Sequence, residues 1–500
     1  MTTTRTLLAA IALSLLVPGG VPAAAEGGLP REPGGVPLTL SPYTFETRDG
    51  RTVEAQRGAF RVPENRRSAR GREIELVFVR FPTTSPTPTA PIVYLAGGPG
   101  GSGITTARGT RFDLFQSLRS VADVIAFDQR GTGDSHTLPP CSRSSEVPLE
   151  VAATRAVVEA AAEEAARFCA AEWRRRGVDL DAYNTEESAD DLEALRRALG
   201  VPKISLWSIS YGSHLAMAAL RRHPGSIERV VLAGPEGPDH TVKHPKDGQE
   251  LLEALARRIA ADAEASEAFP DFLGSMGRVL ERLEKEPAKV SLPQAESREA
   301  VTTAVTAWDI RQLAAGMLRG PETMAYLPMF FRDLEAGDFS SVTRYLPRAR
   351  RVGLSAMYSA MDCASGISPR RSAKVRREAR RTLLQDAING PYEALCRGLG
   401  VRDLGAGFRA PLRTSVPALF ISGTFDGRTP VANAADLLGG FADASHLILE
   451  GAGHSDPLFL SSPQIETWLL DFFRGRELPQ EHRIAVPMPP FQGLPSTASP

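Results

Sequence analysis

Residues 203–216 read KISLWSISYGSHLA, an apolar, strand-forming run that passes through a tight turn into a helix-like run ending near Pro224. In the pattern Gly-x-Ser-x-Gly, a serine occupies the tip of such a strand-turn-helix unit. The residues two before and two after it must be small, because the chain passes close to itself. Gly212 meets this requirement, and Ser208 stands where the first glycine is expected. Ser210 is therefore the candidate nucleophile, with a serine in an ordinary turn as the structural alternative.

A glycine-rich loop lies upstream of this serine. Residues 92–95 (IVYL) form a short apolar run typical of a strand buried on both faces, and residues 96–103 (AGGPGGSG) follow it. Such a loop can point backbone N–H groups at a phosphate or at an oxyanion. It lacks the Gly-Lys-Ser/Thr ending of a phosphate-binding loop and the spacing of a dinucleotide fingerprint. We therefore favour an oxyanion hole, with a glycine-rich surface loop as the alternative.

An acid and a base follow two later strand-like runs. Asp426 comes after the apolar run 416–422, and His454 lies in the loop GAGHS after the run 445–449. A serine hydroxyl needs a base within hydrogen-bond reach, itself oriented by an acid. Alone, Asp426 could be a helix cap or turn residue, and His446, inside a strand-like run, a packing or edge histidine. The order Ser210, Asp426, His454, each at a strand end, favours a catalytic triad.

The alternation of strands and helices divides the chain. Residues 26–240 alternate, which predicts an α/β fold with a mostly parallel sheet covered on both faces. Residues 241–409 are helix-like almost without strands, which predicts an inserted helical lid. The alternating pattern resumes over 410–478, and 479–500 is a proline-rich tail that we expect to be loosely attached.

Composition and the first residues bear on location. The net charge of −1 over 500 residues gives no basic footprint for nucleic acid. Residues 1–25 have the charged, apolar and small-residue regions of a secretory signal. The apolar part is shorter than the roughly 20 residues of a spanning helix, and no cysteine follows for a lipid, so we expect no membrane anchor. The sequence thus predicts a secreted or periplasmic protein.

The four cysteines form two pairs that are close in sequence. In an oxidising compartment we expect Cys141 to pair with Cys169 and Cys363 with Cys396, although four cysteines allow three connectivities. A metal site is disfavoured, because no Cys-x-x-Cys spacing or nearby histidine pair appears.

Five motifs together resemble one family. They are Gly97–Gly101 (GGPGG), Asp128–Ser135 (DQRGTGDS), Ser208–Gly212 (SISYG), Asp426–Pro430 (DGRTP) and Gly453-His454. They resemble the secreted tripeptidyl aminopeptidase and proline iminopeptidase group of α/β-hydrolases, over about residues 61–473 and weakly in the helical insertion. Two departures are Ala96, where a histidine is often found, and Ser208.

The resemblance implies the α/β-hydrolase fold and cleavage of peptides from the amino terminus by Ser210, Asp426 and His454. It also implies an oxyanion hole made by the backbone N–H groups of Gly98 and Tyr211, with no metal or organic cofactor. Exopeptidase action further needs an anion for the substrate ammonium. Glu236, directly after a core strand, is the candidate, with a solvated loop carboxylate as the alternative.

Other functions remain open on the sequence. An esterase or lipase would use the same triad, and a non-catalytic secreted binding protein could share the fold. A dehalogenase or epoxide hydrolase is disfavoured, because these need an aspartate where Ser210 stands. Arg130, in the loop after a core strand, is expected to brace the active-site loops without being catalytic. The oligomeric state does not follow from the sequence.

Overall fold

A computed structural model describes residues 36–68, 71–292 and 300–494. The expected secretory signal over 1–25 lies outside these residues. In the described ranges, no helix combines the length and the apolar character needed to cross a membrane.

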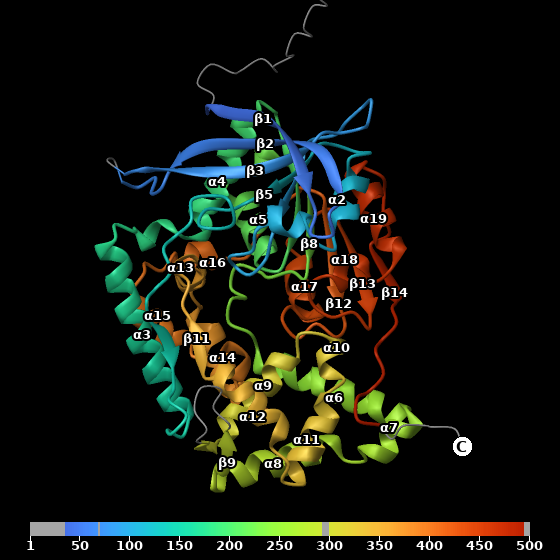
Figure 1. Ribbon diagram of the computed structural model, residues 1–500. Helices are drawn as coiled ribbons and strands as arrows, with labels where there is room; N and C mark the ends of the chain where they lie inside the picture. The colour runs from blue at the N-terminus through green and yellow to red at the C-terminus, as the bar shows by residue number, and fades with distance from the viewer. Residues whose placement is uncertain (1–35, 69–70, 293–299, 495–500) are drawn as a thin grey trace, which may run out of the picture.

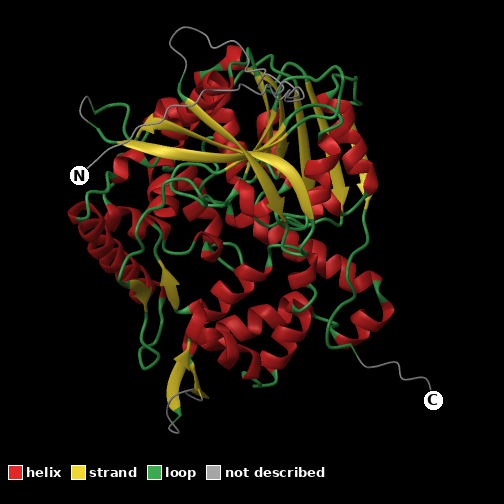
Figure 2. Cartoon of the chain, turned by 45° about the horizontal axis from the view of Figure 1, so that its top comes forward, coloured by secondary structure: helices red, strands yellow, loops and turns green. Residues whose placement is uncertain are grey.

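A ten-stranded sheet runs through the upper part of the molecule (Figures 1 and 2). In spatial order its strands are β1 (Leu38–Glu46), β2 (Thr52–Pro63), β3 (Glu73–Phe81), β5 (Val124–Phe127), β4 (Ile92–Leu95), β7 (Ile204–Ile209), β8 (Ile227–Ala233), β12 (Ala418–Gly423), β13 (Ala444–Glu450) and β14 (Glu481–Ala485).

The first three strands pair antiparallel with each other, and β3 pairs antiparallel with β5. From β5 to β14 every neighbouring pair is parallel. The mostly parallel sheet confirms the predicted fold class. Because parallel strands end at the same edge, the loops after β4, β7, β8, β12 and β13 gather there.

Helices cover both faces of the sheet. Successive side chains of a strand point to opposite faces, so each strand contributes to two separate buried clusters. In β4, Val93 and Leu95 join one buried cluster, and Ile92 and Tyr94 join the other. The first face is covered by α3 (Arg155–Arg175), α4 (Thr185–Leu199), α5 (Tyr211–Arg222) and, at its margin, α17 (Val431–Leu438). The second is covered by α1 (Gly103–Ala107), α2 (Phe112–Leu118), α18 (Pro457–Leu460) and α19 (Pro463–Phe473). Short 3-10 turns are η1 (Leu180–Ala182), η2 (Pro224–Ser226) and η3 (Ala387–Asn389).

Between β8 and β12 the chain forms the helical insertion, most of which lies at the opposite end of the molecule from β1 (Figure 1). Its helices are α6 (Pro245–Ala261), α7 (Ala263–Ala268), α8 (Phe272–Lys285), α9 (Ala307–Met317), α10 (Pro321–Met324), α11 (Leu327–Glu335), α12 (Ser340–Ala349), α13 (Ala356–Ser365), α14 (Pro369–Ala379), α15 (Tyr392–Leu399) and α16 (Gly405–Arg409). Leu252, Ile310 and Phe331 belong to a third buried cluster, so the insertion has its own core. It also holds the ribbon β9 (Ala288–Leu292) with β10 (Val301–Val305), and β11 (Arg351–Gly353), which pairs with β6 (Ser144–Glu146).

The prediction of a loosely attached tail from 479 is wrong for the residues described. Strand β14 adds to the edge of the sheet in parallel with β13, and Ile484 on it is buried. Further on, Phe491 inserts into the core of the insertion, where the Arg258 guanidinium lies 4.3 Å from its ring centre. The sequence does not predict these contacts, because the segment is rich in proline and its anchoring side chains are isolated apolar residues without periodicity.

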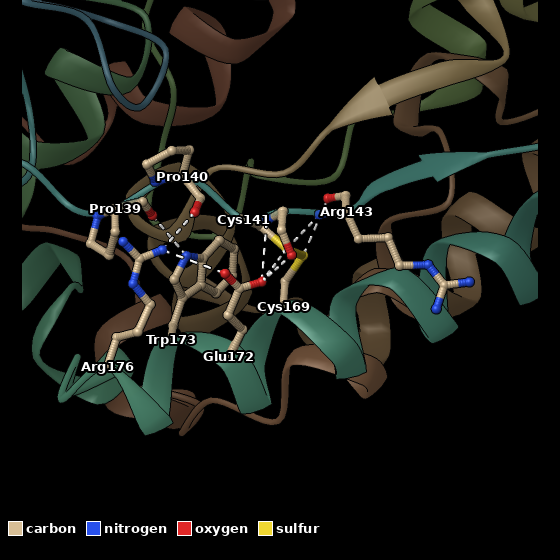
Figure 3. The surroundings of a disulfide bond; sticks show 9 residues. Pro139, Pro140, Cys141, Arg143, Cys169, Glu172, Trp173 and Arg176 are labelled. Carbon is tan, nitrogen blue, oxygen red and sulfur yellow. Dashed lines mark hydrogen bonds and ion pairs between the residues drawn. A yellow bond between two sulfur atoms is a disulfide. The ribbon is translucent and has the colours of Figure 1, made fainter.

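Both predicted disulfides form. Cys141 pairs with Cys169 of α3, with Cα atoms 5.4 Å apart, and Cys363 of α13 pairs with Cys396 of α15, at 5.3 Å. Around the first bond, the Trp173 indole N–H donates to the Pro139 carbonyl at 2.9 Å (Figure 3). The second bond ties α13 to α15, and α15 in turn packs along α3.

Candidate active site

Ser210 lies at the tip of the turn between β7 and α5. Its backbone has φ 54° and ψ −127°, a conformation that residues with a side chain seldom adopt. Its N–H donates to the Ala233 carbonyl at 2.9 Å, and its carbonyl accepts from the Ser213 hydroxyl at 2.6 Å. These bonds hold the strained turn and leave the Ser210 side chain at the wall of a cavity.

Small residues are needed on both sides of Ser210, because the backbone of the turn passes close to other backbone segments. A Cβ on Gly212 would lie 2.2 Å from the Leu95 carbonyl oxygen, so no larger residue fits there without movement. Ser208, the departure from the glycine pattern, is fully buried, and its hydroxyl donates to the Val231 carbonyl. Its polar atom is therefore satisfied, and the turn tolerates a serine at this position.

Asp426 and His454 are hydrogen-bonded to each other. Asp426 Oδ2 lies 2.8 Å from His454 Nδ1, and the Thr429 hydroxyl, 3.1 Å from the same nitrogen, donates to Asp426 Oδ2 at 2.7 Å. Burial alone would raise the pKa of the Asp426 carboxyl. The charge of His454 and hydrogen bonds from His454 and Thr429 outweigh burial and hold this pKa below its ordinary value. Asp426 thus remains ionised beside an imidazole that faces the cavity of Ser210.

The glycine-rich loop packs directly on the serine. A Cβ on Gly97 would lie 2.9 Å from Cβ of Ser210, and Gly98 has φ 125°, in the region that favours glycine. Tyr211 is the first residue of α5, where backbone N–H groups have no partner within the helix. Within the described chain, neither the Gly98 nor the Tyr211 N–H donates to another residue.

A cavity of about 410 Å³ joins these groups. It is lined by both core segments and by the insertion: Tyr94, Ala96, Gly97, Gly98, Gly101, Thr106, Arg111, Ile209, Ser210, Glu236, Thr241, Lys243, Arg319, Tyr358, Asp362, Ile388, Asn389, Tyr392, Arg428, His454 and Ser455. The core therefore supplies the nucleophile, the base and the glycine loop, and the insertion supplies much of the remaining wall.

Two carboxylates and one lysine form a charged group in this cavity. Glu236 is 7% exposed and pairs with Lys243 at 2.9 Å. Asp362 comes from α13. Desolvation, and then the negative charge of Glu236, raise the pKa of Asp362 to about 7. Glu236 is thus a buried wall residue and not a solvated loop carboxylate.

Two residues considered from the sequence lie away from the cavity. Arg130 is fully buried, donates to both oxygens of Asp191 at 2.7 Å and to the carbonyls of Glu64 and Ala182 at 2.6 Å, and so braces β2 and α4. His446 packs inside β13 with Nε2 3.0 Å from the Ser422 hydroxyl, and burial lowers its pKa to about 4. Among the described residues, no cluster of three or more His, Cys, Asp or Glu side chains could hold a metal ion.

Sequence reasoning missed Thr429, Lys243, Asp362 and Arg319. Thr429 stands three residues after Asp426, a short spacing that could have suggested a turn contact. The other three come from the insertion and carry no local signal, since only the fold brings them to the cavity.

Comparisons with known proteins agree with this architecture. A family profile described as alpha/beta hydrolase fold matches residues 90–459. Serine protease Hip1 of Mycobacterium tuberculosis (strain CDC 1551 / Oshkosh) is 28% identical over 188 residues, 36% of this chain and 36% of that protein. Tripeptidyl aminopeptidase of Streptomyces lividans is 29% identical over 189 residues, 35% of this chain and 34% of that protein.

A probable proline iminopeptidase of Streptomyces coelicolor (strain ATCC BAA-471 / A3(2) / M145) is 35% identical over 57 residues, 11% of this chain and 18% of that protein. The chain matches about a third of the length of the first two relatives. These relatives confirm the resemblance drawn from the five motifs.

Proposed function

The chain belongs to the alpha/beta hydrolase fold family, and from that premise we propose that it is a serine aminopeptidase that cleaves peptides near their amino terminus. The observation that carries the proposal is the single cavity shared by Ser210, by His454 hydrogen-bonded to Asp426, and by the buried Glu236 and half-buried Asp362. A nucleophile, a base and an anionic patch for an ammonium are what this reaction needs.

In the proposed reaction, His454 removes the Ser210 proton as the hydroxyl oxygen attacks the peptide carbonyl. Asp426 holds the imidazole with its proton on Nδ1, so that Nε2 is the base. The tetrahedral oxyanion accepts hydrogen bonds from the Gly98 and Tyr211 N–H groups, each contributing about 3 kcal/mol in comparable sites. His454 then protonates the leaving amine. In the second half of the reaction, His454 removes a proton from water, the water oxygen attacks the acyl-enzyme carbonyl, and His454 returns the proton to the departing Ser210 oxygen.

The acidic pair accounts for recognition of the free amino terminus. Glu236 and Asp362 lie at the cavity wall, and Lys243 offsets only one of the two negative charges. A protonated amino group of the substrate neutralises the second negative charge and forms charge-assisted hydrogen bonds with the carboxylates. The insertion, which carries Asp362 and Lys243, acts in this proposal as a lid over the site. The two disulfides fit an oxidising compartment, and we extend the proposal to a secreted or periplasmic enzyme with a signal at 1–25.

A release assay tests the proposal. Purified protein is given Pro-, Ala- and tripeptidyl-aminomethylcoumarin substrates, each free and N-acetylated. We expect hydrolysis of free substrates, and Glu236→Gln should raise their KM roughly 10- to 100-fold, the worth of one hydrogen bond to a charge. The exposed Glu393→Gln serves as the control. Equal cleavage of free and acetylated forms would refute the aminopeptidase, and cleavage of short esters alone would make the protein an esterase.

The pH dependence of KM tests Asp362. With its pKa raised to about 7, Asp362 is neutral below that pH and charged above it. A peptide ammonium is charged below about pH 8. KM for free peptides should therefore be lowest between about pH 7 and 8 and rise toward acid by up to about tenfold per pH unit.

Asp362→Asn should remove this acid-side rise in KM. An N-acetylated or p-nitrophenyl ester substrate serves as the comparison, because it has no ammonium to bind. If the acid limb of KM is the same for ester and free peptide, or survives in Asp362→Asn, the assignment of Asp362 is wrong.

A further inference from the structure

The charged side chains of the catalytic cavity are not all paired. Those lining it, besides His454, are Arg111, Glu236, Lys243, Arg319, Asp362 and Arg428. Lys243 pairs with Glu236 at 2.9 Å, and Arg111 pairs with Asp456 at 2.8 Å. Within residues 36–68, 71–292 and 300–494, the guanidinium groups of Arg319 and Arg428 have neither an ion pair nor a hydrogen bond. Two arginine residues thus line the cavity without an ion-pair partner among the described residues.

Backbone contacts hold both arginines beside the catalytic base. The carbonyl of Arg319 accepts the His454 N–H at 2.9 Å. Arg428 lies in the Asp426 loop, and its N–H donates to Asp426 Oδ1 at 2.8 Å. The N–H of Gly427 also donates to the carbonyl of Leu318 at 3.0 Å, which joins the two segments. The two arginines therefore stand on neighbouring backbone segments, and both segments contact the pair formed by His454 and Asp426.

Glu236 is held on the nucleophile side instead. Its N–H donates to the Ser213 hydroxyl at 2.8 Å, and that hydroxyl donates to the Ser210 carbonyl at 2.6 Å. In a serine hydrolase the histidine protonates the leaving amine, so the leaving part of the substrate lies on the histidine side. Glu236 is thus anchored to the Ser210 turn, and the two arginines without ion pairs stand on the segments that contact His454 and Asp426.

We propose that Arg319 and Arg428 bind a carboxylate on the leaving portion of the peptide substrate. This rests on the proposed function. Guanidinium groups match carboxylates in geometry and donate paired N–H bonds to them. The carboxylate is the free C-terminus of a short peptide or an acidic side chain just after the cleaved bond. The substrate is then a peptide bound at both charged ends or one with an acidic residue at that position.

Matched peptides distinguish the two sources. One pair has the same neutral sequence with a C-terminal carboxylate or amide. A second pair is amidated and carries Glu or Gln directly after the cleaved bond. We expect kcat/KM to be roughly 10- to 100-fold higher for the carboxylate member of one pair, mainly through KM. The preference should weaken with added salt, since Arg319 is exposed and Arg428 is half-buried.

Arginine variants test the assignment through this preference ratio. Arg319→Gln and Arg428→Gln should each lower the ratio, and the double variant should bring it close to one. Because both peptides are measured on the same protein, partial loss of folded enzyme cancels. Arg348→Gln is the matched control, since Arg348 is exposed on α12 and outside the cavity. It should leave the ratio and the basal rate unchanged.

Binding separates this proposal from the aminopeptidase proposal. Calorimetry on Ser210→Ala compares the carboxylate and amide peptides without hydrolysis. Tighter binding of the carboxylate form, lost in the double arginine variant, supports the site even if no peptide is hydrolysed, in which case only the proposed function fails. Equal binding of the two forms, or a preference that survives the double substitution, overturns the arginine site.

Discussion

Replacing Ser210 with alanine is expected to lower kcat for peptide release by about a millionfold, the loss seen when a serine protease loses its nucleophile. The reason is chemical, because an alanine side chain cannot form the acyl-enzyme. The variant should also fail to react with a fluorophosphonate probe. Both results are measured on purified protein by coumarin release and by gel fluorescence of the labelled chain.

The fold should survive this substitution. The bonds that hold the turn use the backbone N–H and carbonyl of Ser210, which alanine retains. Thermal unfolding of the variant therefore serves as the folding check, and the exposed Ser120→Ala is the matched serine control. Retained hydrolysis and labelling in a folded Ser210→Ala protein would exclude this serine as the nucleophile. A wild type that neither hydrolyses nor labels would favour a non-catalytic binding protein.

Replacing Asp426 with asparagine is expected to lower kcat by about ten thousandfold while KM changes little, as for the corresponding change in a serine protease triad. An asparagine can offer its amide N–H to His454 Nδ1. The imidazole then takes the tautomer with its proton on Nε2, where it cannot accept the serine proton. Steady-state kinetics on a free tripeptidyl substrate measure the effect.

The control for this variant is Asp436→Asn, an exposed aspartate on α17 whose carboxylate lies 3.8 Å from His240. It should retain wild-type kinetics. A folded Asp426→Asn protein with activity within tenfold of wild type would show that the hydrogen bond between Asp426 and His454 does not position the base. The acid would then have to be sought elsewhere on the cavity wall.

Much of the core could be predicted from local sequence. The turn at Ser210 follows from a strand-forming run, small residues on either side and a helix-forming run, all within 14 residues. The disulfides Cys141–Cys169 and Cys363–Cys396 join cysteines close in the chain. Strand ends in a parallel sheet meet at one edge, so the positions of Asp426 and His454 after successive strands predict that the two side chains lie close together.

The charged surroundings of the cavity depend instead on long-range packing. No local pattern marks Asp362, because its raised pKa comes from burial and from Glu236, 126 positions earlier in the numbering. Strand β14 was likewise missed, since an edge strand of five residues within a proline-rich segment has little periodicity.

The sequence by itself determined the fold family, the serine turn and the order of the candidate triad, and it favoured the cysteine pairing that the structure then fixed. Each of these features depends on a few residues close in the chain or on the order in which the segments follow one another. Only the tertiary structure decided which charged residues line the cavity: Lys243 paired with Glu236, Asp362 from α13, and Arg319 beside His454. The physical reason is that electrostatic interactions depend on distance and desolvation in space, which the insertion fixes by folding back over the sheet edge.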